Sequence, residues 1–469
     1  MKKRVGLVLL LAAAALTLTA CAAGGEKQKK DPEMTTLVYA ALSEEGVHRS
    51  AVDRFNRTHK EKGVRIEIQE YFDEDGRRGK DRLLTEMASG KIPDIIDLGS
   101  GEYGMSYQQL VRKGYLEDLW PYINSDAALN NGQLFEAPLK AAEVNGGLYT
   151  IFSYVSVNTL VGEERIVGNR YSWNLAELME AFASMPDEST VLEYYRTRDE
   201  MFSYVFRMSV DGYLDWETGK DSFDSDSFRA ALEFVNSFPD DFPSLNFEGG
   251  LQKAKMETED RVREGRQMLS MHDVYVPAMV RALDIAYGHR EKTSFIGYPT
   301  EDGSAGSTFV IQGRKLAMSS TCQDKEAAWE FLREMLISKL RNPEAAYVAQ
   351  KIPLNRADLD KVMKVCTDPP DYIKGNYFDF FHDREDFNFR DFLFEPSKLS
   401  GIKVPSITAD EAGRFLDFIN HVEKIDLYDM DLYDIVYEAC GPYFAGDRSM
   451  EDTIQNIQNK VKIYWNENR

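Results

Sequence analysis

Positive charge, cysteine and histidine are scarce in this sequence, and each shortage excludes a class of function. Lys and Arg together number 56 against 78 Asp and Glu, which gives a formal net charge of −22. A surface this acidic repels phosphate backbones, so we expect no nucleic-acid partner. The six histidines show no metal-ligand spacing, and we expect neither a metal nor a cofactor.

Long apolar runs and internal repeats are also missing. Beyond the N-terminus, no segment reaches about 18 consecutive apolar residues, the length of a membrane-spanning helix. No repeat of about 20–50 residues is visible, which argues against solenoids and propellers. A hydrophobic share of 43% in 469 residues indicates one large or two medium globular domains.

The N-terminus carries the most specific signal. Lys2, Lys3 and Arg4 precede a short apolar run, Val5–Leu16, as in an export signal. The following Leu-Thr-Ala-Cys, Leu18–Cys21, resembles the bacterial lipobox, in which the cysteine is lipidated and everything before it is removed. The alternative is an ordinary signal peptide with a chance cysteine.

The lipobox interpretation divides the start of the chain into two parts. Residues 1–20 would be a lipoprotein signal peptide, and Cys21 would carry the lipid, with palmitate among its acyl chains. Residues 21–36 would be the lipidated cysteine and a flexible tether, because the segment after Cys21 is small and charged without a hydrophobic period. We therefore expect a globule anchored by lipid at the extracellular face of the cell membrane.

An odd number of cysteines remains once Cys21 is set aside. These are Cys322, Cys366 and Cys440. An odd number argues against a disulfide framework. We expect buried free thiols, with a single bridge as the alternative.

Strand and helix patterns alternate in the first part of the chain. Alternation or short apolar runs predict strands over 34–41, 64–71 and 92–98. Apolar residues at helical spacing predict helices over 47–59 and 81–90 and another from Tyr107. This β-α-β-α-β-α order predicts a largely parallel sheet covered by helices.

A glycine loop follows the third predicted strand. Gly99, Gly101 and Gly104 spell G-x-G-x-x-G, which taken alone suggests a dinucleotide site. The second interpretation is a turn that presents Glu102 and Tyr103 to a polar ligand, because ligands bind outside the carboxyl ends of strands in α/β sheets. The motif follows the third strand rather than the first, which favours the second interpretation.

A series of motifs, taken in order, resembles a known family. They begin with the predicted first strand and the segment Phe-Asn-Arg-Thr-His at 55–59. The remaining motifs are Leu83–Ile96, Gly114–Leu119, Gly147–Ile151, Tyr171–Leu178, Asp215–Lys220, Met268–Tyr275, Ala327–Leu332, Ile352–Arg356 and Tyr443–Ser449. Together they resemble extracellular solute-binding proteins, family 1, the sugar-binding lipoproteins of ABC importers related to maltose-binding protein.

The resemblance implies an α/β fold of two lobes, the type 2 periplasmic-binding-protein architecture. Each lobe would be a mostly parallel sheet flanked by helices, with a hinge between the lobes. Residues 37–152 would form the first part of lobe 1, and 153–266 the first part of lobe 2. Residues 267–340 would return to lobe 1 through the hinge, with Met268–Tyr275 as the strand that re-enters it. Residues 341–469 would complete lobe 2.

Candidate ligand contacts lie beside predicted strand ends, a crossing strand and one turn. A sugar offers hydroxyls and flat C–H faces, so its cleft should hold acids and amides beside aromatic rings. Core packing or solvent exposure is the alternative for each candidate. The candidates are Ser43, Glu44, Asp97, Glu102, Tyr103, Phe152, Tyr154, Trp216, Asp273 and Tyr275.

Two further patterns are expected to be structural. Trp173 and Trp329 lie in helical patterns and are expected in the core. The acidic run from Asp426 to Asp434 lacks the spacing of a calcium loop. With Tyr428 and Leu432 it fits a solvated helix.

The resemblance implies a binding protein rather than an enzyme. We expect a monomer that captures a small solute, a sugar or oligosaccharide, and delivers it to ABC permease subunits in the membrane. A non-sugar solute is one alternative. The other is a secreted glycoside hydrolase, which would need two carboxylates about 5–10 Å apart across a cleft.

Overall fold

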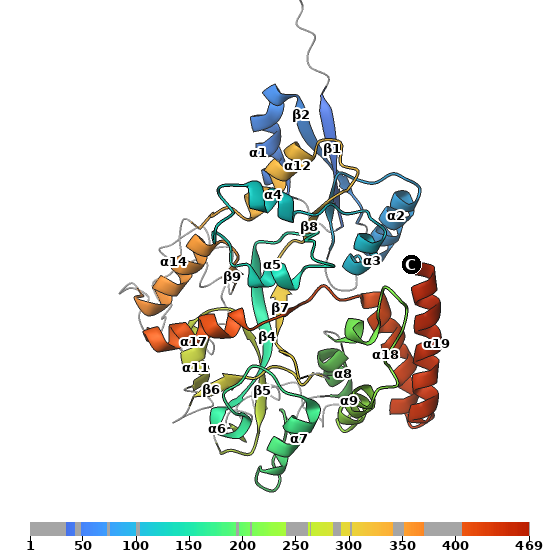
Figure 1. The fold of residues 1–469 in the computed structure, drawn as a ribbon, viewed down its shortest axis with the longest axis vertical. Coiled ribbons are helices and arrows are strands. Elements are labelled where there is room, and N and C mark those ends of the chain that lie inside the picture. The colour runs from blue at the N-terminus through green and yellow to red at the C-terminus, as the bar shows by residue number, and fades with distance from the viewer. Residues whose placement is uncertain are drawn as a thin grey trace, which may run out of the picture.

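The computed structural model has two parts arranged along its long axis, each with its own β-sheet (Figure 1). The structure describes residues 34–42, 48–72, 76–99, 104–193, 197–206, 209–240, 261–262, 264–284, 292–300, 303–340, 351–369 and 406–468. Helices cover both sheets, so the α/β class expected from the sequence is confirmed. No helix in these ranges is long and apolar enough to cross a membrane.

The first sheet contains the three strands that were predicted from the start of the chain. Its order is β2 (Val64–Glu70), β1 (Thr35–Ala41), β3 (Ile95–Asp97) and β8 (Leu316–Met318). β1 runs parallel to β2 and to β3, and only β8 is antiparallel to its neighbour. The mostly parallel sheet predicted for this part is therefore confirmed.

Side-chain alternation explains the edge strand of this sheet. Val64 and Ile66 of β2 are buried while Arg65 and Glu67 are exposed, as the sequence predicted for a half-exposed strand. The helices and 3-10 turns of this part are α1 (Arg49–His59), η1 (Lys60–Lys62), α2 (Gly76–Ala88), α3 (Tyr107–Arg112), α4 (Trp120–Ser125), α5 (Ala137–Ala141), α12 (Lys325–Leu332) and η5 (Arg333–Met335).

The second sheet is built around the long strand β4 (Tyr154–Glu163). Its main order is β10 (Lys424–Ile425), β7 (Thr308–Ile311), β4 and β5 (Leu269–Val274), and β6 (Thr293–Phe295) and β9 (Ile352–Pro353) also pair with β4. All four neighbours of β4 run antiparallel to it, and only β10 and β7 are parallel. The prediction of a mostly parallel sheet is therefore wrong for the second sheet. That prediction came from the β-α-β pattern of the first 112 residues, whereas the strands of the second sheet run back along β4.

The position of β5 differs from the expectation as well. The segment 268–275 was expected to re-enter the first lobe. Instead, β5 pairs with β4 along its whole length, from Leu269 opposite Gly162 to Val274 opposite Val157. The chain returns to the first sheet at β8, where Leu316 also bridges Ile151. Backbone pairing with the long strand β4 therefore keeps residues 268–275 in the second sheet.

Two hydrophobic cores use opposite faces of β4. Val155, Val157 and Val161 belong to the core that continues into the first sheet, while Leu160 belongs to the second core. Trp173 and Trp329 are buried, as predicted. Helices and turns of the second part are α6 (Glu164–Val167), α7 (Leu175–Ala183), α8 (Arg198–Phe206), η3 (Val210–Tyr213), α9 (Asp226–Asn236), α11 (Ala278–Leu283), α14 (Arg356–Thr367), α17 (Ala409–Asn420), α18 (Met430–Phe444) and α19 (Met450–Asn468).

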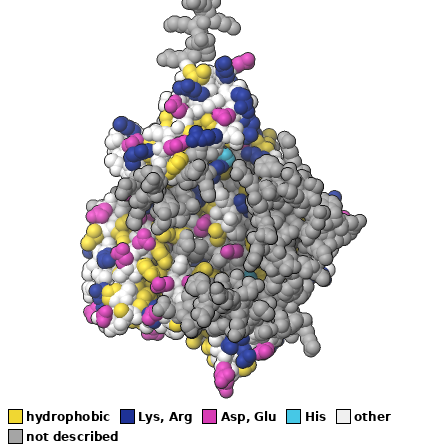
Figure 2. Space-filling view, turned by 180° about the vertical axis from the view of Figure 1, so that it is seen from behind, with side chains coloured by type: hydrophobic (Ala, Val, Ile, Leu, Met, Phe, Trp, Pro, Cys, Tyr) yellow, Lys and Arg dark blue, Asp and Glu magenta, His cyan; other side chains and the backbone are white. Residues whose placement is uncertain are grey.

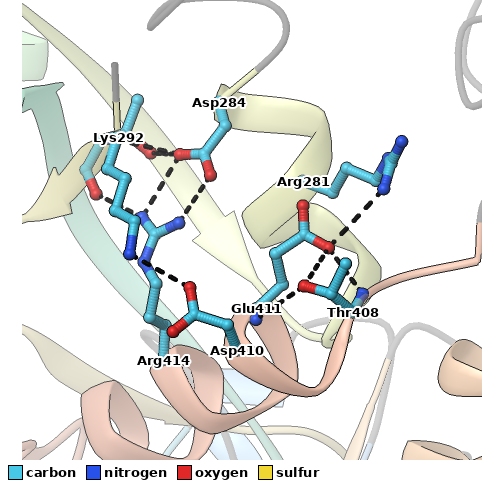
Figure 3. A network of polar contacts seen from close by, with 8 residues as sticks. Arg281, Asp284, Lys292, Thr408, Asp410, Glu411 and Arg414 are labelled. Carbon is cyan, nitrogen blue, oxygen red and sulfur yellow. Dashed lines mark hydrogen bonds and ion pairs between the residues drawn. The ribbon is translucent and has the colours of Figure 1, made fainter.

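Ion pairs hold α17 against α11 and the end strand β6 (Figure 3). The Arg414 guanidinium donates to both carboxylate oxygens of Asp284, at 2.5 and 3.2 Å, and to the Thr293 carbonyl at 2.7 Å. The Lys292 ammonium lies 3.0 Å from the Asp410 carboxylate. Because these groups come from three elements, they fix the start of the C-terminal region on the second sheet.

Candidate functional site

A cavity of about 710 Å³ lies between the two parts of the molecule. The first part contributes α3 and α5, and the second contributes the start of α7, η3, α9 and the segment around β10. Its lining includes Tyr107, Gln108, Glu143, Asn174, Asp211, Tyr213 and Tyr428. A concave space of this size, with a few polar groups among apolar ones, is typical of a small-molecule site.

The aromatic wall of the cavity is held in place from behind. The Tyr107 hydroxyl donates to the Ala142 carbonyl at 2.9 Å and accepts from the Tyr149 backbone N–H at 3.0 Å. Burial raises the pKa of this phenol, so it stays neutral. Tyr213 packs against Phe228, with ring centres 5.1 Å apart. Both residues are buried, so they shape the cavity wall from behind and offer little exposed area.

Two polar residues on the cavity wall, Asn174 and Glu143, already accept hydrogen bonds within the protein. Asn174 caps α7, because its side chain accepts from the Glu177 N–H at 2.9 Å while Glu177 reaches back to the Asn174 N–H. This reciprocal pair of hydrogen bonds is a capping box. Glu143 accepts from the Trp120 indole N–H at 2.8 Å. Each acceptor keeps further lone pairs, so both can still bind a ligand hydroxyl.

A buried polar cluster lies directly behind the cavity. We call it the Asp429 cluster: Ser106, Gln109, Asp211, Asp429 and Tyr464. The fully buried Asp429 carboxylate accepts from the Ser106 hydroxyl at 2.6 Å, the Tyr464 hydroxyl at 2.8 Å and the Gln109 amide at 3.4 Å. It also caps α18 by accepting from the Leu432 N–H at 3.0 Å.

Asp211 connects this cluster to the cavity. Its carboxylate accepts from the Asp429 backbone N–H at 3.0 and 3.3 Å, and the residue lines the cavity. Burial, and then the neighbouring Asp429 charge, raise the pKa of Asp211 to about 8, although the Asp429 N–H and Arg112 act in the opposite direction. A carboxyl group with a pKa near neutrality in a cavity wall is a functional-site candidate.

A smaller pocket of about 40 Å³ lies where β3 ends. Leu98, Gly104 and Lys315 line it, and it shares Tyr107 and Tyr428 with the larger cavity. The glycine loop predicted as a ligand-binding turn therefore ends at this pocket. Its central residues Gly101, Glu102 and Tyr103 lie outside the described part of the chain.

Asp97 and Phe152, two of the predicted contacts, are buried and line neither space. The Asp97 carboxylate accepts from the Gly99 N–H at 3.0 Å and so fixes the turn after β3. Burial raises the pKa of Asp97, against the lowering by the Gly99 N–H and by Arg314 and Lys315. Phe152 is fully buried in the core around the first sheet.

The other four described candidates lie away from the cavity wall. The Lys351 ammonium is 5.8 Å from the Tyr154 ring centre. Asp273 is exposed and accepts from the Asn158 amide at 2.9 Å. Tyr275 packs against the core, and Trp216 lies under the Arg112 guanidinium. Ser43, Glu44, Glu102, Tyr103 and Cys21 lie outside the described residues.

Sequence reasoning missed the residues that line the cavity. Tyr107 was assigned to the apolar face of a helix, and Tyr428 to a helix that begins only at Met430. The acidic run was expected on a solvated helix, yet Asp429 is fully buried and Asp426 accepts from the Ile311 N–H at 2.9 Å. One signal was available, because Asp429 stands before an apolar period as an N-cap does. In the described ranges, no group of three or more His, Cys, Asp or Glu could hold a metal ion.

Comparison with known proteins gives neighbours in structure only. No protein-family model matches the chain, and no curated protein sequence matches it. The sugar-binding protein MalE from Xanthomonas citri is 15% identical, with 92% of this chain and 98% of that chain covered and a TM-score of 0.47. An extracellular solute-binding protein family 1 from Alicyclobacillus acidocaldarius is 14% identical, covered over 92% and 99%, with a TM-score of 0.43. The ABC substrate-binding protein Lmo0181 from Listeria monocytogenes, in complex with cycloalternan, is 14% identical, covered over 91% and 98%, with a TM-score of 0.41. Likenesses at this level transfer neither a ligand nor a partner to this chain.

Proposed function

We propose that this protein is the solute-binding component of an ABC importer, and that it captures a carbohydrate in the cavity between its two parts. The observation that carries the proposal is the cavity itself, whose wall combines fixed aromatic rings with hydrogen-bonding groups from both parts. A ligand that contacts both walls stabilises the arrangement in which they face each other. The order of family-like motifs along the sequence also supports this function.

Two crossing segments support a hinge between the parts. The chain passes from the first part to β4 through Ile151, and it returns to β8 through Leu316. The Ile151 and Leu316 backbones exchange two hydrogen bonds, at 2.8 and 3.0 Å. Two crossing segments joined in this way can bend together while both sheets stay intact, which is the motion expected of a binding protein that closes on a solute.

A thermal-shift screen tests the function. Neutral mono- and oligosaccharides should raise the melting temperature, and peptides and polyamines serve as the comparison classes. A ligand at 100 times its Kd stabilises the folded state by about 2.7 kcal/mol, which such a screen detects readily. If no carbohydrate shifted the melting temperature, the proposed ligand class would be wrong. Turnover of a labelled oligosaccharide would instead favour the hydrolase alternative.

Gln108→Ala locates the binding site. Gln108 is half-buried on the cavity wall, so its loss should weaken carbohydrate binding by about tenfold while the melting temperature without ligand stays unchanged. Gln133→Ala is the control, because that side chain is exposed and does not line the cavity.

The glycine loop remains a proposed second wall of the site. Glu102→Ala and Tyr103→Ala should also weaken binding without lowering the melting temperature of the free protein. If only these two variants affected the Kd, the ligand would occupy the glycine-loop side, and the larger cavity would not be the site.

The lipid anchor is a separate part of the proposal. Cys21 would carry the lipid and hold the protein at the extracellular face of the cell membrane, next to the permease. Labelled palmitate should be incorporated into the natural chain and not into a Cys21→Ser variant. Equal labelling of both chains would contradict the anchor and leave the solute-binding function untouched.

A further inference from the structure

Asp211 is an acceptor with unused capacity in the cavity wall. It lies in η3, between Val210 and Tyr213, and is half-buried. Within the described part of the chain, one donor reaches its carboxylate, the Asp429 backbone N–H at 3.0 and 3.3 Å. A carboxylate offers about four lone-pair sites, so Asp211 can accept additional hydrogen bonds from a bound molecule.

The charges around Asp211 do not balance. Asp429 accepts from four donors, which stabilises its negative charge, and it lies against Asp211. Arg112 is the cation that acts on both carboxylates. Its guanidinium stacks 3.8 Å from the Trp216 ring centre, and its three nitrogens are buried without a hydrogen-bond partner in the described ranges. One cation therefore faces two carboxyl groups, and Asp211 is the one that reaches the cavity.

The rest of the wall adds to this imbalance. Four carboxylates line the cavity against one basic side chain: Glu143, Asp211, Asp226 and Glu423 against Lys424. Lys80 lies 3.5 Å from the Asp431 carboxylate, so this cation is already paired. A concave space lined mainly by one sign of charge concentrates counter-ions of the opposite sign. An anionic solute would meet repulsion from this wall, and a cationic one would be attracted.

We propose that the cavity selects carbohydrates that carry an ammonium group, that is, amino sugars or their oligomers, and that the ammonium binds at the Asp211 carboxylate. The inference rests on the proposed function, because it names the ligand class of the same cavity. Tyr428, which is half-buried in the same lining, provides apolar area for the sugar ring, and Gln108 on α3 can meet its hydroxyls.

Proton release should accompany binding. Because the pKa of Asp211 is about 8 in the free protein, its carboxyl group is mostly protonated below that pH. An ammonium group stabilises the ionised form, so Asp211 loses its proton to the buffer as the ligand binds. The charged and titratable groups that face Asp211 or share its cavity are Arg112, Glu143, Asp226, Glu423, Lys424, Asp429, Asp431 and Tyr464.

Matched oligosaccharides of equal length test the proposal. Glucosamine oligomers carry the amine, N-acetylglucosamine oligomers are their neutral counterparts, and a uronate oligomer supplies negative charge. We expect the amine form to bind at least about tenfold more tightly than the neutral form, and the uronate more weakly than both. Calorimetry at pH 6 in buffers of different ionisation enthalpy should show release of about one proton per amine-bearing ligand.

Asp211→Asn is the decisive variant, because it keeps the shape of the side chain and removes its charge. The tenfold preference and the proton release should both disappear, while the neutral oligomer still binds. Asp224→Asn is the control, since Asp224 is exposed and does not line the cavity.

The outcomes separate this inference from the proposed function. Equal binding of the amine and neutral oligomers would overturn the inference and leave the function intact, and so would an unchanged preference in Asp211→Asn. Binding of polyamines without any carbohydrate would overturn the carbohydrate function and support a cation at Asp211. Binding of nothing in the panel would overturn both.

Discussion

The Ser106 hydroxyl donates a hydrogen bond of 2.6 Å to the Asp429 carboxylate, although 323 residues separate the two in the sequence. Each residue caps a helix, Ser106 at the start of α3 and Asp429 at the start of α18. Tyr464 of α19 donates to the same carboxylate. One buried acid therefore joins the first part of the molecule to the two C-terminal helices, which lie side by side in Figure 1.

Replacing Asp429 should destabilise the protein strongly. Asp429→Ala removes a helix cap and leaves the Ser106 and Tyr464 hydroxyl donors without their acceptor. We expect the free energy of unfolding to fall by roughly 2–4 kcal/mol, because a lost cap costs about 1 kcal/mol and buried orphan donors cost more. Urea unfolding followed by circular dichroism measures the change. Asp360→Ala, an exposed position on α14, is the control and should unfold at the wild-type urea concentration.

Replacing Gly306 and Gly413 by alanine should change the stability of the protein in opposite directions. A Cβ atom on Gly306 would lie 1.8 Å from the Tyr298 carbonyl oxygen, in backbone that cannot move aside. Gly306→Ala should therefore lower the melting temperature by several degrees or prevent folding. Gly413 lies exposed in α17 with open space around it, so Gly413→Ala should stabilise the protein by roughly 0.5–1 kcal/mol. Equal effects from the two substitutions would contradict the close approach at Gly306.

The sequence was most informative where neighbouring residues determine structure. The alternation in Val64–Glu70 predicted β2 almost to the residue, because one face of an edge strand is buried and the other is in water. The helix predicted over 81–90 begins earlier, at Gly76. The prediction missed this start because the polar first turn shows no apolar period. The three later cysteines are buried and free, as expected.

The cavity could not be read from the sequence, because its wall is assembled from distant segments. Tyr107, Asp211 and Tyr428 stand more than 100 residues apart, and none of them belongs to a motif with recognisable spacing. The pairing of β5 with β4 depends equally on long-range contacts. Asp97 was chosen at a strand end and Phe152 beside the crossing strand, but both side chains are buried and neither lines the cavity.

The three buried thiols should resist modification in the native protein. Burial raises the pKa of Cys322, Cys366 and Cys440 to about 12 in each case. The thiolate is the reactive form of cysteine. For protein expressed without residues 1–21, a disulfide reagent at pH 8 should therefore react negligibly with the native state. In urea, the same reagent should react with all three thiols. A Ser125→Cys variant supplies an exposed thiol that should react within the mixing period. If native protein that lacks the Ser125→Cys substitution reacted rapidly, the burial of the three thiols would be contradicted.

Acid should remove the stabilising effect of the Asp126–Arg333 pair. The Arg333 guanidinium donates to Asp126 at 2.6 and 3.0 Å, and this hydrogen bonding is the main cause that lowers the pKa of Asp126, against burial. A carboxyl group whose pKa is lower in the folded state stabilises the fold at pH values above its unfolded pKa of about 3.9. This stabilisation is lost as the pH falls through the lower, folded pKa.

The pH dependence distinguishes this pair from an ordinary packing contact. At pH 7, Asp126→Asn should lower the free energy of unfolding by roughly 1.5–3 kcal/mol, the range for a hydrogen bond to a charged group. The gap between wild type and variant should narrow steadily below pH 4, as urea unfolding at a series of pH values would show. Glu136→Gln, which disrupts the exposed pair with Lys140, should change little at any pH. A gap for Asp126→Asn that stayed constant down to the lowest pH at which the protein is folded would mean that Asp126 acts through packing and not through its charge.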